Sequence, residues 1–539
     1  MRRPSLELSL LLAILAFVGL FAVLPSGVLF ASTLESAGGL AGVEAVVGNP
    51  VNQRALANSL TQGGVSAALA VGVGYLPGVF LGRYAWPGRS VVRSVLLVPF
   101  LLPSVIVVLG VLDLFGPAGL ATRAVPGLGL FGSGLPGIVA ANLLYNVPIV
   151  MLLTATGCEV ASVELEETAA SLGGAPSRVY WDTWARPSWV GAAAGALLTF
   201  VFSALSFAPP LLLCGVRCYT VEAQVWSLEF LLQPASAGVL SLVLIGLFLA
   251  PTLAYLFLVR RLRGSPGVRV SRSRAVPWKH PIAWAMAATT GLVLLCEAAL
   301  LAAVLYRSAA PSGLAGFGSS WTELFSSATA GRLGISVAGT AGNTLLFAAG
   351  AAVVTLLVGI GGSFVTSRHP GTSLPLGLVL FIPLLLSPVV LALSLASFWR
   401  PILGGEANVW LLIVLSQSML ALPLALQSLE IPLAGLARSV SESAEALGAT
   451  RWGAFVDTKL PRVRGGLVTA SLFAFAVGLG EFTATYFLVT PPFTTLPVAV
   501  YDLTDARLFP AADAAAGLLL LLSLAVYAAI VFGGRRVEL

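Results

Sequence analysis

The chain has 539 residues, of which 58% are hydrophobic and only 10% are charged, and its formal net charge is +6. An ordinary soluble domain has about 45–50% apolar and about 25% charged residues, so this composition excludes a soluble globular protein and favours a lipid environment. The basic residues are scattered among short loops without a recognisable module, which argues against nucleic acid as a partner.

Apolar stretches recur along the chain, and each is long enough to cross a bilayer as a helix of about 20 residues. Lipid offers the backbone no hydrogen-bond partners, so such segments must be helical. We predict an all-α polytopic membrane protein with about twelve transmembrane helices in two parallel six-helix repeats. The predicted spans are 6–32, 57–82, 90–115, 134–157, 189–214, 236–260, 282–306, 341–366, 374–399, 408–429, 465–489 and 511–534. The first span continues too far for a secretory signal, so we expect it to be retained.

The orientation follows from arginine and lysine, which accumulate in short loops on the cytoplasmic side. If the N-terminus is cytoplasmic, 22 of the 29 basic residues fall on that side. This predicts a multi-pass protein of the cell membrane with both termini in the cytoplasm.

The first cytoplasmic loop of special interest covers about residues 158–188 and contains Glu167-Thr-Ala-Ala-Ser-Leu-Gly173. Acidic residues precede Gly173 and Gly174, and basic residues follow them, as suits a helical segment whose N-terminal end prefers anions. A glycine can end one helix and redirect the chain into another. We therefore expect two short helices that meet at the glycine pair and protrude from the membrane.

Four cysteines lie in or beside apolar runs, without the spacing of a metal site. Cys214 and Cys218 are one helical turn apart near the predicted outer surface. Packing is the favoured role, and a redox or metal role is the alternative. The sequence predicts no metal site, no catalytic residue and no bound cofactor.

A basic, glycine- and serine-containing segment over residues 264–281 separates two halves, which are predicted as residues 1–263 and 282–539. It is a candidate flexible cytoplasmic linker that could touch anionic lipid heads. In the following span Glu297 is an acidic residue in lipid, which makes it a candidate pathway residue by default. A structural partner for this carboxylate is the favoured alternative.

A second copy of the loop motif covers about residues 430–464 and reads Glu442-Ser-Ala-Glu-Ala-Leu-Gly448, followed by Leu460 and Pro461. Its charges have the same order, with acidic residues first and basic residues last. The glutamate and the glycine of the two copies are each 275 residues apart. Further matches at the same offset, including Tyr219-Thr-Val with Thr494-Thr-Leu, argue for an internal repeat of the entire half. Nearer the start of each half the offset is 285, where Asn58-Ser59 matches Asn343-Thr344.

Glu481 in the eleventh span is the strongest candidate for a pathway residue, and the repeat places Ser206 at the corresponding position. The carboxylate could attract a cation, or it could pair with a polar group and hold a bend in the helix. Asp113 and Asp502 lie near outer span ends, where we expect solvated loop charges.

Both loops resemble the signature loop of permease subunits of ATP-binding-cassette importers. The second copy matches closely, with Glu442, Ala444, Gly448, Leu460 and Pro461 at the expected positions. The first departs more, since Thr168 follows the glutamate and Pro187 comes one residue later than the pattern and follows Arg186. The fused halves are similar to the thiamine and ferric-iron permeases of that family.

The resemblance implies that the loops couple to ATPase subunits, two copies of a separate cytoplasmic chain, and that an extracytoplasmic substrate-binding protein delivers thiamine or ferric iron. The chain itself is then no enzyme, since neither of its two lysines follows a glycine as a Walker A loop requires, and ATP is used by the partner. The implied coupling residues are Glu167, Ala169, Leu172, Gly173, Gly174, Glu442, Ala444, Leu447, Gly448, Ala449 and Pro461.

Two other classes fit twelve spans in two halves. A secondary transporter with parallel repeats would need no ATPase, and a channel or structural membrane protein gives no reason for the duplicated loop.

Overall fold

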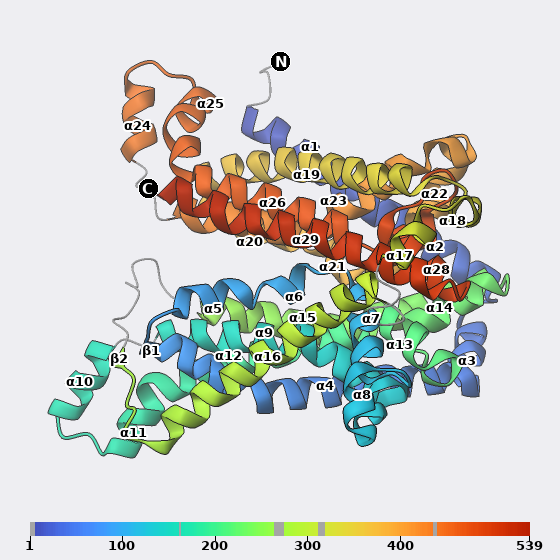
Figure 1. Ribbon diagram of the computed structural model, residues 1–539. Coiled ribbons are helices and arrows are strands. Elements are labelled where there is room, and N and C mark those ends of the chain that lie inside the picture. Colours follow the sequence, from blue (N-terminus) through green and yellow to red (C-terminus); the bar gives the residue numbers. More distant parts are fainter. Residues whose placement is uncertain (1–5, 161–162, 263–273, 311–317, 435–438, 539) are drawn as a thin grey trace. The chain divides into compact units, whose positions relative to one another are not determined.

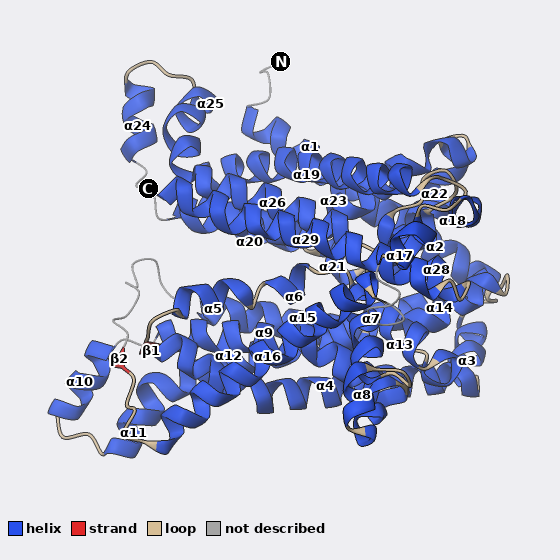
Figure 2. Cartoon of the chain, in the orientation of Figure 1, coloured by secondary structure: helices blue, strands red, loops and turns tan. Residues whose placement is uncertain are grey.

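The computed structural model describes residues 6–160, 163–262, 274–310, 318–434 and 439–538. Nearly all of this part of the chain is helical (Figure 2). Its strands are β1 (Tyr84–Ala85) and β2 (Arg274–Ala275), which pair in parallel. The predicted all-α class is confirmed.

Among the residues that the structure describes, ten helices are long and apolar enough to span a bilayer, and two shorter apolar helices, Pro388–Ile402 and Val409–Pro423, accompany them. Each of the twelve predicted spans overlaps one of these helices. The predicted spans 189–214 and 465–489 are displaced toward the C-terminus, however. The corresponding helices run over Ser177–Ala204 and Arg451–Gly480 and end before the predicted limits. The chain breaks after each of them and continues in a short separate helix.

The chain forms two compact units, which we describe separately. Unit 2 comprises Leu40–Leu102 and Ile106–Tyr306. Its centre is formed by α4, α9 and α12, which pack against one another, while α15 packs on α12. Its elements are α3 (Leu40–Gly48), α4 (Pro50–Arg83), β1, α5 (Arg89–Val95), α6 (Val98–Leu101), α7 (Ser104–Phe115), α8 (Leu120–Ala124), η2 (Pro126–Gly132), α9 (Gly134–Val160), α10 (Val163–Ser171), α11 (Pro176–Tyr180), η3 (Trp181–Ala185), α12 (Arg186–Ala204), α13 (Ala208–Leu213), η4 (Gly215–Cys218), α14 (Val221–Phe230), α15 (Pro234–Leu262), β2 and most of α16 (Pro281–Ala309).

Unit 1 comprises Met1–Gly39, Pro103–Val105 and Arg307–Leu539. Here α19, α23 and α26 form the centre, α1 packs on α19, and α29 packs on α26 and α28. Its elements are α1 (Leu6–Val18), η1 (Gly19–Val23), α2 (Leu24–Ser36), α17 (Ser319–Leu324), α18 (Ser327–Leu333), α19 (Val337–Arg368), η6 (Pro370–Thr372), α20 (Ser373–Leu380), α21 (Ile382–Leu385), α22 (Pro388–Ile402), η7 (Gly405–Asn408), α23 (Val409–Ala434), α24 (Ser439–Ala446), α25 (Arg451–Ala454), η8 (Phe455–Lys459), η9 (Leu460–Val463), α26 (Arg464–Gly480), α27 (Thr483–Leu488), α28 (Leu496–Asp505) and α29 (Phe509–Glu538).

The compact units are not the two predicted halves. The first span of the chain, α1 to α2, belongs to the unit built from the second half, and most of α16 belongs to the unit built from the first half. The boundaries 1–263 and 282–539 therefore remain a prediction about the sequence repeat, and the packing of the chain cuts across them. Most of the predicted linker, residues 263–273, lies outside the described residues.

The third span of each half is broken in the same way. Short helices α6 and α21 interrupt the predicted spans 90–115 and 374–399, and each carries a proline in its first turn, Pro99 and Pro383. A proline has no N–H to donate, so it is tolerated at a helix start and breaks the continuity of a longer helix. A purely hydropathic prediction could not place these breaks.

Candidate functional site

The two predicted motif loops have the same local geometry, one in each unit. Gly173 lies two residues after the end of α10 and Gly448 two residues after the end of α24, and both glycines have left-handed backbones, with φ of +82° and +96°. In each loop the residue after the glycine donates its N–H to a carbonyl five residues earlier: Gly174 to Ala169 and Ala449 to Ala444. Each glycine also donates its own N–H to the carbonyl three residues earlier, Gly173 to Ala170 and Gly448 to Glu445. The two bonds in each loop form the Schellman ending of a helix, which favours glycine at the left-handed position.

The residue before each glycine is a leucine that projects into the surroundings. Leu172 is 83% exposed and Leu447 is 90% exposed. In each unit the loop helices lie at one end, α10 and α11 beside the two strands and α24 and α25 at the end where α1 begins (Figure 1). Each motif loop therefore exposes one apolar side chain, Leu172 or Leu447, at the turn between its two short helices.

Beyond the glycine the loops differ in detail. We call the motif loop of residues 158–188 loop 1 and that of residues 430–464 loop 2. In loop 2 the Thr450 side chain caps the next helix, α25, by accepting a hydrogen bond from the Gly453 N–H. In loop 1 the next helix, α11, has Pro176 in its first turn instead. A π-helical turn follows in both, η3 and η8. Pro461 then falls in η9, but Pro187 lies in the first turn of α12. The irregular spacing of the first copy thus places its proline in the following membrane helix.

An arginine at the end of a central helix forms an ion pair with a glutamate of each loop. Arg83 ends α4 and makes two hydrogen bonds of 2.9 Å with Glu166 of α10, and Arg368 ends α19 and forms a hydrogen-bonded ion pair with Glu445 of α24. The Arg368 guanidinium lowers the pKa of Glu445 below its usual value. The two arginines are 285 residues apart, the same offset as Asn58 and Asn343. The sequence motifs do not include these arginines, although their repeated spacing indicates them.

The repeat is also visible at the opposite end of each unit. Asn58 donates to the carbonyls of Arg217 and Tyr219, both at 3.1 Å. Asn343 donates to the carbonyls of Pro492 and Thr494, at 2.8 and 3.1 Å. The next residue repeats as well: the Ser59 hydroxyl accepts from Val221 N–H, and the Thr344 hydroxyl accepts from Leu496 N–H.

The candidate pathway positions Ser206 and Glu481 lie at the corresponding breaks of the two units, after α12 and after α26. Glu481 is 9% exposed, and its carboxylate accepts hydrogen bonds of 2.7 Å from the backbone N–H groups of Ala484 and Thr485 and one of 2.6 Å from the Thr485 hydroxyl. It thus caps α27. The Ser206 hydroxyl accepts a weaker bond from Gln62, at 3.2 Å. This geometry favours the second of the two roles predicted for Glu481, holding a bend in the helix.

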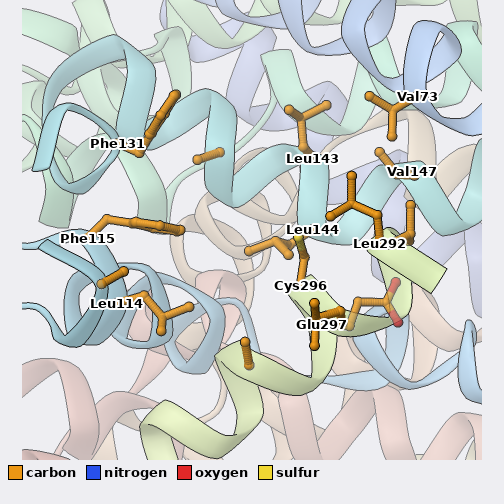
Figure 3. Close-up of a pocket in the computed structure, with 15 residues that line it drawn as sticks. Val73, Leu114, Phe115, Phe131, Leu143, Leu144, Val147, Leu292, Cys296 and Glu297 are labelled. Atoms are coloured by element: carbon orange, nitrogen blue, oxygen red, sulfur yellow. The ribbon is translucent and has the colours of Figure 1, made fainter. Parts of the chain in front are cut away.

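Glu297 lines an apolar cavity of about 500 Å³ within unit 2. Figure 3 shows it on α16 beside Cys296 and Leu292, with aromatic and aliphatic side chains around the hollow. Its carboxylate oxygens are buried and have no hydrogen-bond partner among the residues that the structure describes. The structural partner favoured for Glu297 from the sequence is therefore not found there.

Three expectations about outer residues were wrong. Cys214 and Cys218 form a disulfide rather than a packing pair. Asp113 is buried, with 8% of its surface exposed. Asp502 lies in α28, where burial raises its pKa to about 6. Both residues were expected to be solvated loop charges, but Asp113 lies within α7 and Asp502 within α28. Within the described ranges, no group of three or more candidate metal ligands occurs.

Comparison with known proteins decides the family. The family described as "Binding-protein-dependent transport system inner membrane component" matches residues 74–264, which include the first motif loop. The molybdenum transport system permease protein ModB of Escherichia coli (strain K12) is 34% identical over 171 residues, which are 29% of this chain and 73% of that protein. The chain belongs to this family.

A second relative extends the likeness over both halves. The thiamine transport system permease protein ThiP of Escherichia coli (strain K12) is 24% identical over 470 residues, or 82% of each chain. The ModB protein of Mycobacterium tuberculosis (strain ATCC 25618 / H37Rv) is 28% identical over 207 residues, 37% of this chain and 77% of that protein. The predicted resemblance to importer permeases with two fused halves is confirmed, and the chain is a multi-pass permease of the binding-protein-dependent ABC importers. Secondary transport is therefore no longer the alternative class.

Proposed function

We propose that this permease carries its substrate on the energy of ATP hydrolysed by separate subunits, and that each motif loop receives one of two copies of that ATPase. The observation that supports this proposal is the exposed leucine at the same position of each motif loop, Leu172 and Leu447. A single exposed leucine is ordinary on a protein surface. Two leucines that are more than four-fifths exposed, at the same turn of two repeats, instead suit a helix end that inserts into a groove of a partner.

The loops lie on the cytoplasmic side in this proposal, where the ATPase works, and both chain termini lie there too. The Cys214–Cys218 disulfide supports this orientation. Its neighbour Arg217 contacts Asn58 near the start of α4, while Arg83 beside loop 1 ends the same helix. Disulfides persist in oxidising compartments, so the disulfide end faces outward and the loop end faces inward.

Thiamine is the substrate that we favour. The thiamine permease is similar to this chain over 82% of both proteins, whereas the molybdenum permease of Escherichia coli matches 29% of this chain. The higher identity of the second match, 34%, makes an oxyanion such as molybdate the competing substrate. Ferric iron remains a further candidate from the sequence. Uptake of radiolabelled thiamine that survives an excess of molybdate and of ferric iron would support thiamine.

The coupling assignment is tested by replacing both exposed leucines with aspartate. Leu172→Asp and Leu447→Asp together should reduce co-purification of the ATPase with the permease by at least about tenfold, because a charge at the centre of an apolar docking groove costs several kcal/mol. Both side chains are exposed, so the membrane helices should remain folded. The matched control is Leu232→Asp, since Leu232 is 87% exposed and lies after α14. Unaltered co-purification in the double variant, or an equal loss in the control, would contradict the assignment.

A further inference from the structure

Each motif loop is held from a second side by a charged residue that lies near the start of an outer helix. In unit 2 Arg274, seven residues before α16 begins, lies 3.5 Å from Glu166 of loop 1. In unit 1 Glu7, in the first turn of α1, lies 3.0 Å from Arg451 of loop 2 and 3.9 Å from Arg368. The two contacts occupy matching places, but their charges are opposite.

The contact in unit 2 has a rigid support. Strand β2 pairs with β1, so that Arg274 lies opposite Tyr84, the residue after Arg83. Beyond the strand, the Trp278 ring contacts Phe80 edge to face at 6.4 Å, and the Trp278 carbonyl accepts a hydrogen bond from the Trp284 indole. The end of the linker is therefore fixed to the end of α4. Arg274 also lines a hollow of about 380 Å³ together with residues of loop 1.

The contact in unit 1 involves a buried charge. The Glu7 side chain is only 6% exposed and lies in an acidic first turn, where the helix dipole favours a negative charge. It faces two arginines, Arg368 from the central helix and Arg451 from the start of α25. One carboxylate thus connects the outer helix, the central helix and the loop.

The two loop helices differ in burial, since α24 buries Ser441. Helix α10 has no buried residue, and loop-tip segments with few apolar contacts open locally at low free energy. Ion pairs of partly buried groups can then control how rigidly a loop is presented.

We propose that Arg274 and Glu7 are positioning residues, which fix loop 1 and loop 2 respectively in the orientation that a partner needs. Arg274, before α16, and Glu7, in α1, then have equivalent positioning roles, as ties of the two loops. What the loops dock to rests on the function proposed above, but the ties themselves do not depend on it.

Hydrogen–deuterium exchange of the full-length permease in lipid nanodiscs tests the ties without any partner. Arg274→Ala should speed amide exchange in α10 by roughly two- to fivefold, the range expected for losing one partly exposed ion pair, and leave α24 unchanged. Glu7→Gln should speed exchange in α25, which begins with Arg451, and leave α10 unchanged. Each variant is thus the control for the other, and Arg274→Lys should restore most of the protection.

Coupling provides the second measurement. In the complex with the ATPase, both variants should still co-purify with it, because Leu172 and Leu447 are intact, but substrate should stimulate ATP hydrolysis at least about threefold less than in the wild type. Unchanged exchange, or equal acceleration of both loops in either variant, would overturn the ties. Loop-specific exchange combined with a wild-type permease that binds no ATPase would uphold the ties and refute the proposed function instead.

Discussion

The acidic residue Glu481 shows why an intramembrane charge need not serve transport. Two backbone N–H groups at the start of α27 have no partner within that helix, and the carboxylate accepts both. A cap of this kind satisfies the donors that a broken helix leaves free. Its counterpart Ser206 lies at the same break but accepts its bond from a side chain, Gln62.

A graded set of substitutions measures the cap. Glu481→Ala should destabilise the permease by about 2–3 kcal/mol, because buried N–H groups lose their acceptors, and Glu481→Gln, which keeps one acceptor oxygen, should lie between this variant and the wild type. Ser206→Ala should cost about 1 kcal/mol or less. Thermal unfolding in nanodiscs gives the order. If Glu481→Ala changed only the KM for a cationic substrate and left the melting temperature intact, the carboxylate would serve the pathway instead.

Asp502 predicts a pH dependence of stability. Burial raises its pKa to about 6, with an opposing effect of Arg332, whereas an unfolded aspartate titrates near 3.9. The folded state therefore holds its proton more tightly, so stability falls as pH rises from about 4 to about 6 and stays lower above that. Asp502→Asn should stabilise the permease by about 1–2 kcal/mol at pH 7.5 and have little effect at pH 4. Melting curves at both pH values check this, and an equal gain at both would disprove the titration of Asp502 as the cause.

At the scale of single elements, the repeat predicted from the sequence is reproduced by hydrogen bonds. Asn58 of α4 and Asn343 of α19 donate to equivalent carbonyls, and a left-handed glycine follows the first helix of each motif loop. Side-chain identity and spacing predicted that these positions match and that the glycines end helices, but not the hydrogen bonds of the asparagines. The breaks at α6 and α21, the capping by Glu481 and the ties of Glu7 and Arg274 could not be predicted, because they depend on which distant segments meet.

Equivalent bonds should have equivalent cost. Asn58→Ala and Asn343→Ala each remove two hydrogen bonds to loop carbonyls that remain partly solvated, so each should destabilise its unit by about 1 kcal/mol. The two losses should add in the double variant, since the sites share no partner. Protease susceptibility of the loops at 215–220 and 490–495 reports each unit separately. A large effect at one asparagine and none at the other would show that the repeat is not matched in energy.

At the scale of the whole molecule, the first helix of each sequence half belongs to the compact unit that is built mainly from the other half. Residues 1–39 complete unit 1, and most of α16 completes unit 2. Length and hydropathy predicted how many helices there are but not which half each one joins, because the apolar faces of α1 and α16 are equally suited to any helix in lipid.

This arrangement predicts which fragment is the folding unit. A fragment of residues 40–306 should resist protease in nanodiscs better than the predicted half, residues 1–263, because it contains α16 and lacks α1 and α2, which pack on α19 and α22 of unit 1. Quantified limited proteolysis compares the two fragments at equal expression. Greater resistance of the 1–263 fragment would show that the sequence halves, rather than the packing units, fold independently.

The place of α1 in unit 1 also has a consequence for biosynthesis. Helix α1 leaves the ribosome long before α19, against which it packs and which begins at Val337. About 300 further residues must be made in between, which takes roughly 15–60 s at common elongation rates. The contacts of Glu7 with Arg368 and Arg451 can form only after that interval, so α1 must wait at the translocon or in the bilayer before it is fixed in unit 1.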